Sequence, residues 1–285
     1  MQKAFRVCAY HLTATSAPQI CTKVPTAGGK TLIGIYALQE ILNAMDKRQG
    51  EPRVCVWLVP SLSIKDQVLT RFNTAGDGYW LALREALGHR VSVLSKEELL
   101  SGSGKFNAQR VREEVVIAVL TYDSLRTRKV EGRKLYESNS ELSSFSADIA
   151  VSEPDDSFDS DSLVAALASL QPVVIVDESH NATSELSRES IDRLKPSCVL
   201  ELTATPRETA NIISFVDAMA LRDEHMVKLP VVVRNLSLTN QPLFPMPLIY
   251  KSVSKQRQLL NKIMAALTFG LSCFFKQNRK IKLIV

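Results

Sequence analysis

Residues 24–31, which read VPTAGGKT, have the residue types and spacing of a loop that binds phosphate. Small residues let successive backbone N–H groups turn inward around a phosphate, and the N-terminus of a following helix adds partial positive charge. Lys30 would reach the β- and γ-phosphates of a nucleotide, and the Thr31 hydroxyl would ligate Mg²⁺. The segment departs from the pattern G-x-x-x-x-G-K-[ST] at Val24, and a glycine-rich turn before a helix is the alternative interpretation. The residues predicted to bind the nucleotide are Pro25, Thr26, Ala27, Gly28, Gly29, Lys30 and Thr31.

A pair of carboxylates, Asp177 and Glu178, follows the apolar run 173–176. If that run is a strand of an open parallel sheet, both carboxylates project from the carboxyl end of the sheet, where ligands bind. Asp177 would then hold Mg²⁺ through water, and Glu178 would orient and polarise an attacking water. A solvated turn is the alternative, but the presence of the Lys30 loop favours chemistry. These residues predict an enzyme that binds ATP and Mg²⁺ and hydrolyses ATP, with Lys30, Asp177 and Glu178 as catalytic residues.

Three further runs carry hydroxyl groups at the ends of apolar segments. The runs read LTATPR at 202–207, VPS at 59–61 and LTYDSL at 120–125. At Pro60, Ser61 and Thr121, ordinary strand-to-helix turns are one interpretation.

The phosphate loop, the carboxylates and the hydroxyl groups can meet at one edge of a sheet only if they follow parallel strands. Short β-branched runs alternate with amphipathic segments, which is typical of βα units that build a parallel sheet buried on both faces. The candidate strands occupy 20–24, 54–59, 91–94, 115–120, 173–176 and 199–203. Helical periodicity follows the first strand, and Pro60 and Ser61 open a second helix toward Phe72. We predict an α/β fold with a mostly parallel sheet and helices on both faces.

Two changes of composition divide the chain. Residues 138–162 are rich in Ser and Asp and poor in large apolar groups, so burial would not offset their ordering entropy and we expect a mobile acidic insertion. Beyond about residue 235 the chain contains several prolines, then a helical stretch and an apolar end. We predict one lobe at 1–235, followed at 236–285 by a linker, a helix and what resembles the start of a truncated second lobe.

Charge and hydropathy restrict the class of protein. The net charge is +5, but residues 135–187 contain eleven Asp or Glu and no Lys or Arg, so the rest of the chain is strongly basic. A basic surface suits a polyanionic partner, and ordinary solvated Lys and Arg are the alternative. No apolar stretch reaches the roughly 18 residues of a membrane helix, no signal peptide is evident, and the five cysteines lie far apart. We expect a cytoplasmic protein with no membrane partner.

The order of these motifs resembles a known superfamily. PTAGGKT, DESH and LTATPR resemble motifs I, II and III of the DEAD/DEAH-box class of superfamily 2 helicases, and the 59–61 and 120–125 runs resemble two further motifs of the same lobe. Within the superfamily, VPTAGGKT, DESHN, LTATPR and the later stretch MVKLP are most similar to the helicase-like (Res) subunit of type III restriction endonucleases. The resemblance covers about residues 20–235. It implies that turns at Pro60, Ser61 and Thr121 contact a phosphate backbone through hydroxyl and N–H groups, which fixes the position of a nucleic acid without reading its sequence.

The resemblance implies a RecA-like P-loop NTPase lobe in which Thr203 and Thr205 link the nucleotide state to strand movement. His180 would couple the nucleotide to the nucleic-acid face, although a lone His after a strand is often a satisfied polar residue. The implied partners are duplex DNA, a modification (methyltransferase) subunit and a second helicase lobe, whose arginine finger contributes roughly 10³–10⁵ in rate. Because no such lobe is found in the sequence, we expect the chain to bind ATP better than it hydrolyses it.

The resulting prediction is the ATP-binding motor lobe of a DNA helicase or translocase from a type III restriction-modification enzyme, which couples ATP hydrolysis to movement on duplex DNA. Two alternatives stay open. One is a helicase lobe of DNA repair, phage or RNA metabolism. The other is a fragment that binds nucleotide or nucleic acid without turnover.

Overall fold

The computed structural model describes residues 17–25, 28–45, 51–102, 104–126, 134–151, 159–179, 185–207 and 211–215, together with Ala265. Three predicted site residues, Thr26, Ala27 and His180, lie outside the described residues. The predicted linker and second lobe at 236–285 also lie outside them, apart from Ala265.

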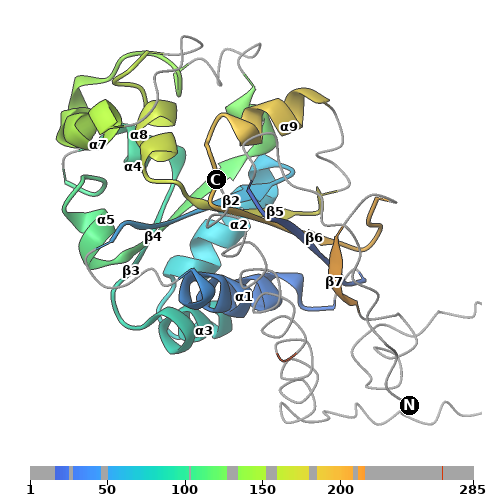
Figure 1. Ribbon diagram of the computed structural model, residues 1–285. Helices are drawn as coiled ribbons and strands as arrows, with labels where there is room; N and C mark the ends of the chain where they lie inside the picture. Colours follow the sequence, from blue (N-terminus) through green and yellow to red (C-terminus); the bar gives the residue numbers. More distant parts are fainter. Residues whose placement is uncertain are drawn as a thin grey trace, which may run out of the picture.

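A seven-stranded sheet forms the centre of the described part of the chain (Figure 1). Its strands are β1 (Gln19–Lys23), β2 (Arg53–Val59), β3 (Val91–Leu94), β4 (Val115–Thr121), β5 (Val173–Asp177), β6 (Cys198–Thr203) and β7 (Ile212–Phe215). The order across the sheet is β3-β4-β2-β5-β6-β1-β7, and each described pairing is parallel. The carboxyl ends of all the strands therefore meet at one edge, where ligands bind in open α/β sheets.

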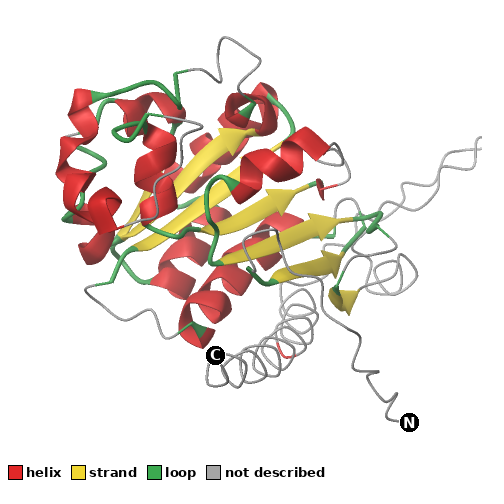
Figure 2. Cartoon of the chain, turned by 45° about the horizontal axis from the view of Figure 1, so that its top comes forward, coloured by secondary structure: helices red, strands yellow, loops and turns green. Residues whose placement is uncertain are grey.

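Helices cover both faces of this sheet (Figures 1 and 2). One face carries α1 (Lys30–Ala44), α2 (Leu62–Asn73) and α3 (Gly78–Leu87). The other side carries α4 (Lys96–Leu100), α5 (Arg110–Glu113), α7 (Ser146–Val151), α8 (Leu163–Ser169), α9 (Glu185–Asp192) and the 3₁₀ turns η1 (Tyr122–Leu125) and η2 (Ser140–Phe145). The predicted α/β fold, with a parallel sheet between two layers of helices, is confirmed.

Burial on both faces explains why the strands were readable from sequence. In β2, alternate side chains pack into opposite cores: one core takes Cys55, Trp57 and Val59, and the other takes Val54, Val56 and Leu58. Strands buried in this way are nearly continuous apolar runs. All six predicted strands are confirmed to within one residue at each end, whereas β7 was not predicted.

Helix α1 packs closely against the sheet at Gly34. A Cβ atom at this position would lie 2.6 Å from Cη2 of Trp57, which is fully buried in β2. A larger residue would push the helix outward, because carbon atoms do not approach so closely without strain. Gly34 therefore helps to fix the position of α1, and with it the helix N-terminus that carries Lys30.

The prediction of a mobile insertion at 138–162 is wrong for the parts that the structure describes. Residues 140–151 form η2 and α7, and both Leu142 and Phe145 are fully buried. The ring of Phe145 lies 4.8 Å, centroid to centroid, from that of Phe106, and Asp148 pairs with Arg112 at 2.5 Å. Two large apolar side chains suffice here because neighbouring elements already supply a core for them. Residues 152–158 lie outside the described residues.

Candidate functional site

The predicted phosphate loop connects the carboxyl end of β1 to the N-terminus of α1. Gly28 N–H donates to the Pro25 carbonyl at 3.0 Å, which closes a tight turn just before the helix. Gly29 precedes α1 with a left-handed backbone, φ 79° and ψ 28°, a conformation that glycine adopts without a steric penalty. A Cβ atom at Gly29 would meet nothing within 4 Å. Among the described residues, nothing therefore fills the space beside Gly29, as a loop that receives a phosphate requires.

The Lys30 ammonium group forms an ion pair with the Glu178 carboxylate, with 2.6 Å between Nζ and Oε1. Lys30 is the first residue of α1, and Glu178 directly follows β5. The Lys30 side chain is only 8% exposed and that of Glu178 is 22% exposed. Glu178 also has a left-handed backbone, with φ 52°. A non-glycine residue in this conformation is often found at a functional turn.

Asp177, the last residue of β5, is buried beside this ion pair. Its Oδ1 atom has no hydrogen-bond partner within the described part of the chain. Burial, together with the negative charge of Glu178, raises the pKa of Asp177 to about 6, although the charge of Lys30 acts in the opposite direction. A buried carboxylate oxygen without a partner is a place where a cation could bind. The Asp177 carboxylate and the hydroxyl of Thr31, which lies in the first turn of α1, are ligand types that suit Mg²⁺.

The LTATPR segment contacts the phosphate loop through the main chain. The backbone N–H of Val24 donates to the carbonyl of Thr203 at 2.8 Å, and the backbone N–H of Thr205 donates to the Thr203 hydroxyl at 3.2 Å. Thr203 is fully buried at the end of β6, whereas Thr205 is exposed. The end of β6 is therefore hydrogen-bonded to the start of the phosphate loop.

The hydroxyl groups predicted to contact nucleic acid cap local structure. Ser61 Oγ accepts the backbone N–H of Ile64 at the start of α2, at 3.3 Å. Thr121 Oγ1 accepts the backbone N–H of Ser124 at the start of η1, also at 3.3 Å, and Thr121 is 4% exposed. Pro60, half-buried, links β2 to Ser61. The three residues lie at the carboxyl edge of the sheet. Thr121 ends β4, which lies two places from β5, the strand that carries Asp177.

Tyr122 is a site residue that sequence reasoning missed. Its hydroxyl donates to the backbone carbonyl of Asp177. Burial, reinforced by the nearby carboxylates of Asp177 and Glu178, raises the pKa of Tyr122, so the phenol stays protonated and able to donate. This hydrogen bond thus links the LTYDSL segment to Asp177, the first residue of the acid pair.

A second missed group is Glu201, a carboxylate buried within β6. Its Oε1 accepts the side-chain amide of Gln19 at 2.7 Å and lies 3.9 Å from the Arg207 guanidinium. Its Oε2 accepts the Ser179 hydroxyl at 3.5 Å. The Glu201 carboxylate therefore contacts the first residue of β1 and two residues near the motifs. Ser179 follows the Asp177–Glu178 pair, and Arg207 ends the LTATPR segment.

The described residues contain no group of three or more His, Cys, Asp or Glu side chains placed to hold a metal ion together. They also contain no helix that is long and apolar enough to cross a membrane.

Comparison with known proteins gives one match to a family and a similarity among solved structures. The sequence model of the family described as "Type III restriction enzyme, res subunit" matches residues 2–208. The Sulfolobus solfataricus SWI2/SNF2 ATPase core in complex with dsDNA is similar at 18% sequence identity, with a TM-score of 0.31, over 66% of this chain and 28% of that chain. This chain therefore spans less than a third of the length of that structure. No curated protein matches the sequence.

Proposed function

We propose, on the premise that this chain belongs to the type III restriction enzyme res-subunit family, that it is the ATP-binding motor lobe of a DNA translocase. The family is helicase-like, so the chain is an enzyme of the ATP-hydrolysing helicase class, as its motifs predicted. We further propose that ATP hydrolysis is coupled to movement on duplex DNA, and that a second lobe and a modification subunit complete the motor.

The observation that carries the nucleotide half of the proposal is the Lys30–Glu178 ion pair at the open N-terminus of α1. Lys30 would hold the β- and γ-phosphates, together with backbone N–H groups at the N-terminus of α1. Asp177 and Thr31 would hold Mg²⁺, which neutralises charge on the phosphates when bound. Glu178, once Lys30 has turned to the phosphates, would be left to orient the attacking water.

Coupling to movement is supported by hydrogen bonds that join the motifs. The carbonyl of Thr203 accepts the N–H of Val24 next to the loop, and the Tyr122 hydroxyl donates to the carbonyl of Asp177. A shift of the loop or of Asp177 on phosphate release would therefore move the ends of β6 and β4. Thr205 and His180 are the residues we propose to pass that shift to nucleic acid.

ATP hydrolysis by the purified chain, measured with and without duplex DNA and beside nucleotide binding, tests the proposal. Lys30→Ala should abolish nucleotide binding, whereas Lys105→Ala should leave it unchanged, because Lys105 is 56% exposed and pairs only locally with Glu98. DNA-stimulated turnover that depends on Lys30 would establish a working motor. Lys30-dependent binding without turnover would establish a lobe that needs its partner, and absence of nucleotide binding would overturn the proposal.

A further inference from the structure

Glu201 is a carboxylate buried within β6, between two leucines, and it is only 5% exposed. A buried carboxylate is costly unless hydrogen bonds and a counter-charge satisfy it, and even a well-paired one adds little to stability. β6 lies between β5, which ends in Asp177, and β1, which leads to the phosphate loop. Stability alone is therefore a weak reason for a carboxylate at this place in the sheet.

The two oxygen atoms of Glu201 have different partners. Oε1 accepts the side-chain amide of Gln19 at 2.7 Å and lies 3.9 Å from the guanidinium of Arg207. Gln19 is itself held in place, because its backbone carbonyl accepts the side-chain amide of Asn211 at 2.7 Å. Oε2 accepts the hydroxyl of Ser179 at 3.5 Å. One oxygen is thus fixed by the strands of the sheet, and the other holds a residue that follows β5.

Ser179 directly follows Glu178, whose backbone is strained. The φ of Glu178 is 52°, and a residue other than glycine keeps such a conformation only when its surroundings fix it. Ser179 is 2% exposed, so its hydroxyl needs a partner inside the protein. Its hydrogen bond to Glu201 is long, but the acceptor is charged and buried, which strengthens it. This hydrogen bond therefore fixes one flank of the strained residue.

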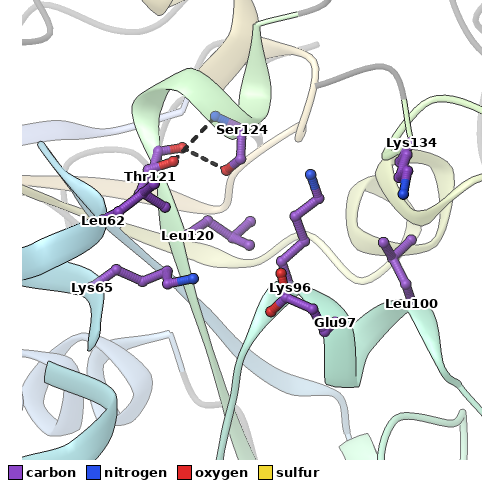
Figure 3. Close-up of a pocket in the computed structure, with 9 residues that line it drawn as sticks. All are labelled: Leu62, Lys65, Lys96, Glu97, Leu100, Leu120, Thr121, Ser124 and Lys134. Atoms are coloured by element: carbon purple, nitrogen blue, oxygen red, sulfur yellow. Dashed lines mark hydrogen bonds between the residues drawn. The ribbon is translucent and has the colours of Figure 1, made fainter. Parts of the chain in front are cut away.

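The other flank of Glu178 is fixed from β4. The Tyr122 hydroxyl donates to the backbone carbonyl of Asp177, the residue before Glu178. Tyr122 begins η1, whose start is closed by two hydrogen bonds between Thr121 and Ser124 (Figure 3). The strained residue thus has a hydrogen-bonded neighbour on each side, one held from β4 and one held from β6.

The charge of Glu201 also reaches this site. Burial is the main cause of the raised pKa of Tyr122, and the charges of Asp177, Glu178 and Glu201 raise it further. Glu201 therefore lies near the phenol that holds Asp177. The two supports of the strained turn are parts of one buried cluster.

We propose that Glu201 is a positioning residue: through Ser179 it holds the left-handed turn that places the Glu178 carboxylate against Lys30. This inference rests on the proposed function, in which Glu178 orients the attacking water. Glu201 does not touch the reacting atoms. Its effect on turnover comes from the place it gives to Glu178, since a misplacement of ~1 Å in a site costs about 10²-fold in rate.

The first test needs no nucleotide. The Lys30 amine of the full chain is acetylated with acetic anhydride, and mass spectrometry gives its rate relative to the exposed Lys105. Ser179→Ala removes the donor hydroxyl, so Glu178 should leave Lys30 more often and acetylation of Lys30 should become faster. The worth of one buried hydrogen bond predicts a rise of about 2- to 10-fold. Glu201→Ala should give a similar rise and the double variant no more, because both changes remove one contact.

Two further variants separate positioning from a general loss of stability. Ser162→Ala is the matched control, because the buried Ser162 hydroxyl accepts the N–H of Ala165 at 3.2 Å at the start of α8. It should lower stability to urea about as Ser179→Ala does, yet leave acetylation of Lys30 unchanged. Glu201→Gln keeps the shape and a hydrogen-bonding group at both ends of the contact. It should therefore keep acetylation of Lys30 close to the wild-type rate.

The second test separates ATP affinity from ATP turnover in the presence of duplex DNA. Ser179→Ala should lower kcat by up to about 10²-fold. Nucleotide affinity should be equal or higher, because a loosened Glu178 competes less for Lys30. A purely structural role predicts the opposite for affinity, since a destabilised site binds more weakly. Ser162→Ala should change neither quantity.

Several outcomes would overturn the inference. Unchanged acetylation of Lys30 in Ser179→Ala would do so, as would an equal rise in Ser162→Ala. Acetylation in Glu201→Gln as fast as in Glu201→Ala would show that charge acts and the hydrogen bond does not. If Glu201→Ala fails to fold, Ser179→Ala alone decides. If acetylation behaves as expected but the chain binds no nucleotide, the proposed function fails while the hold of Glu201 on the turn stands.

Discussion

The ammonium group of Lys30 and the carboxylate of Glu178 lie 2.6 Å apart, although they follow strands that β6 separates in the sheet. The cation expected to bind phosphate is thus already paired with the acid expected to position water. Since Lys30 is largely buried, this attraction acts in a medium less polar than water and is stronger than at the surface. We propose that a phosphate binding to Lys30 replaces Glu178, and that the released carboxylate then becomes available to the attacking water.

We expect Glu178→Gln to separate binding from turnover. The amide cannot act as a base and no longer competes through its charge for Lys30. Nucleotide affinity should therefore be equal or higher, while turnover should fall by roughly 10²–10⁴-fold, the range for loss of an acid–base group. Binding of a fluorescent ATP analogue and steady-state phosphate release, both in the presence of DNA, measure the two effects. Turnover within a few fold of the wild type would show that Glu178 is not the base.

Tyr122→Phe should lower ATP turnover because Asp177 is then held less firmly in position. The variant removes the hydroxyl that donates to the Asp177 carbonyl, and loss of one buried hydrogen bond costs about 0.5–1.5 kcal/mol of unfolding free energy. Tyr136→Phe is the matched control, since the buried Tyr136 hydroxyl donates to the carbonyl of Leu125 at 2.6 Å, away from Asp177. Urea denaturation should show similar losses for both variants. Only Tyr122→Phe should reduce ATP turnover, and equal turnover in the two would exclude a role for Tyr122 at the site.

The sequence was sufficient for most of the sheet but not for its edge. Buried parallel strands are continuous β-branched runs, so β2, β4 and β5 were predicted within one residue. β7 has four residues, and the outer two are exposed, which leaves only two buried positions to mark it as a strand. Residues 140–151 were misjudged because composition averages over a segment, whereas two buried side chains, Leu142 and Phe145, are enough to anchor it.

Prediction of the site from the sequence was limited in the same way, at the level of single residues. Local motifs identified Lys30, Asp177 and Glu178. No single segment of the sequence, however, predicts the strand order that places Lys30 beside Glu178. Glu201 was not predicted at all. A single carboxylate within an apolar run gives no sign of burial, and its amide partner Gln19 is 182 residues away in sequence.

Gly34→Ala should destabilise the lobe through a clash between α1 and the sheet. The added methyl group would lie 2.6 Å from Trp57, and overpacking of a core costs typically 1–3 kcal/mol of unfolding free energy. Gly78→Ala, in the first turn of α3, is the control, because a Cβ there meets nothing within 4 Å and alanine favours a helix. Chemical denaturation should place Gly34→Ala below the wild type and Gly78→Ala at or above it. Equal stability of both variants would mean that α1 can move away from Trp57 without cost.

Gly29→Ala should weaken nucleotide binding through the backbone alone. Space is not limiting at Gly29, since a Cβ would meet no atom within 4 Å, but alanine adopts its φ of 79° only at a cost of about 1–2 kcal/mol. If the loop relaxes to avoid this cost, binding must restore the left-handed conformation, and affinity should fall about tenfold. Gly76→Ala is the matched control, because Gly76 has a φ of 88° and equally open surroundings but lies before α3. Gly29→Ala should therefore lose affinity for ATP with little loss of unfolding free energy, whereas Gly76→Ala should leave affinity for ATP unchanged. An equal loss of affinity in both would mean that the effect comes from general destabilisation, and that the conformation of Gly29 has no special part in holding phosphate.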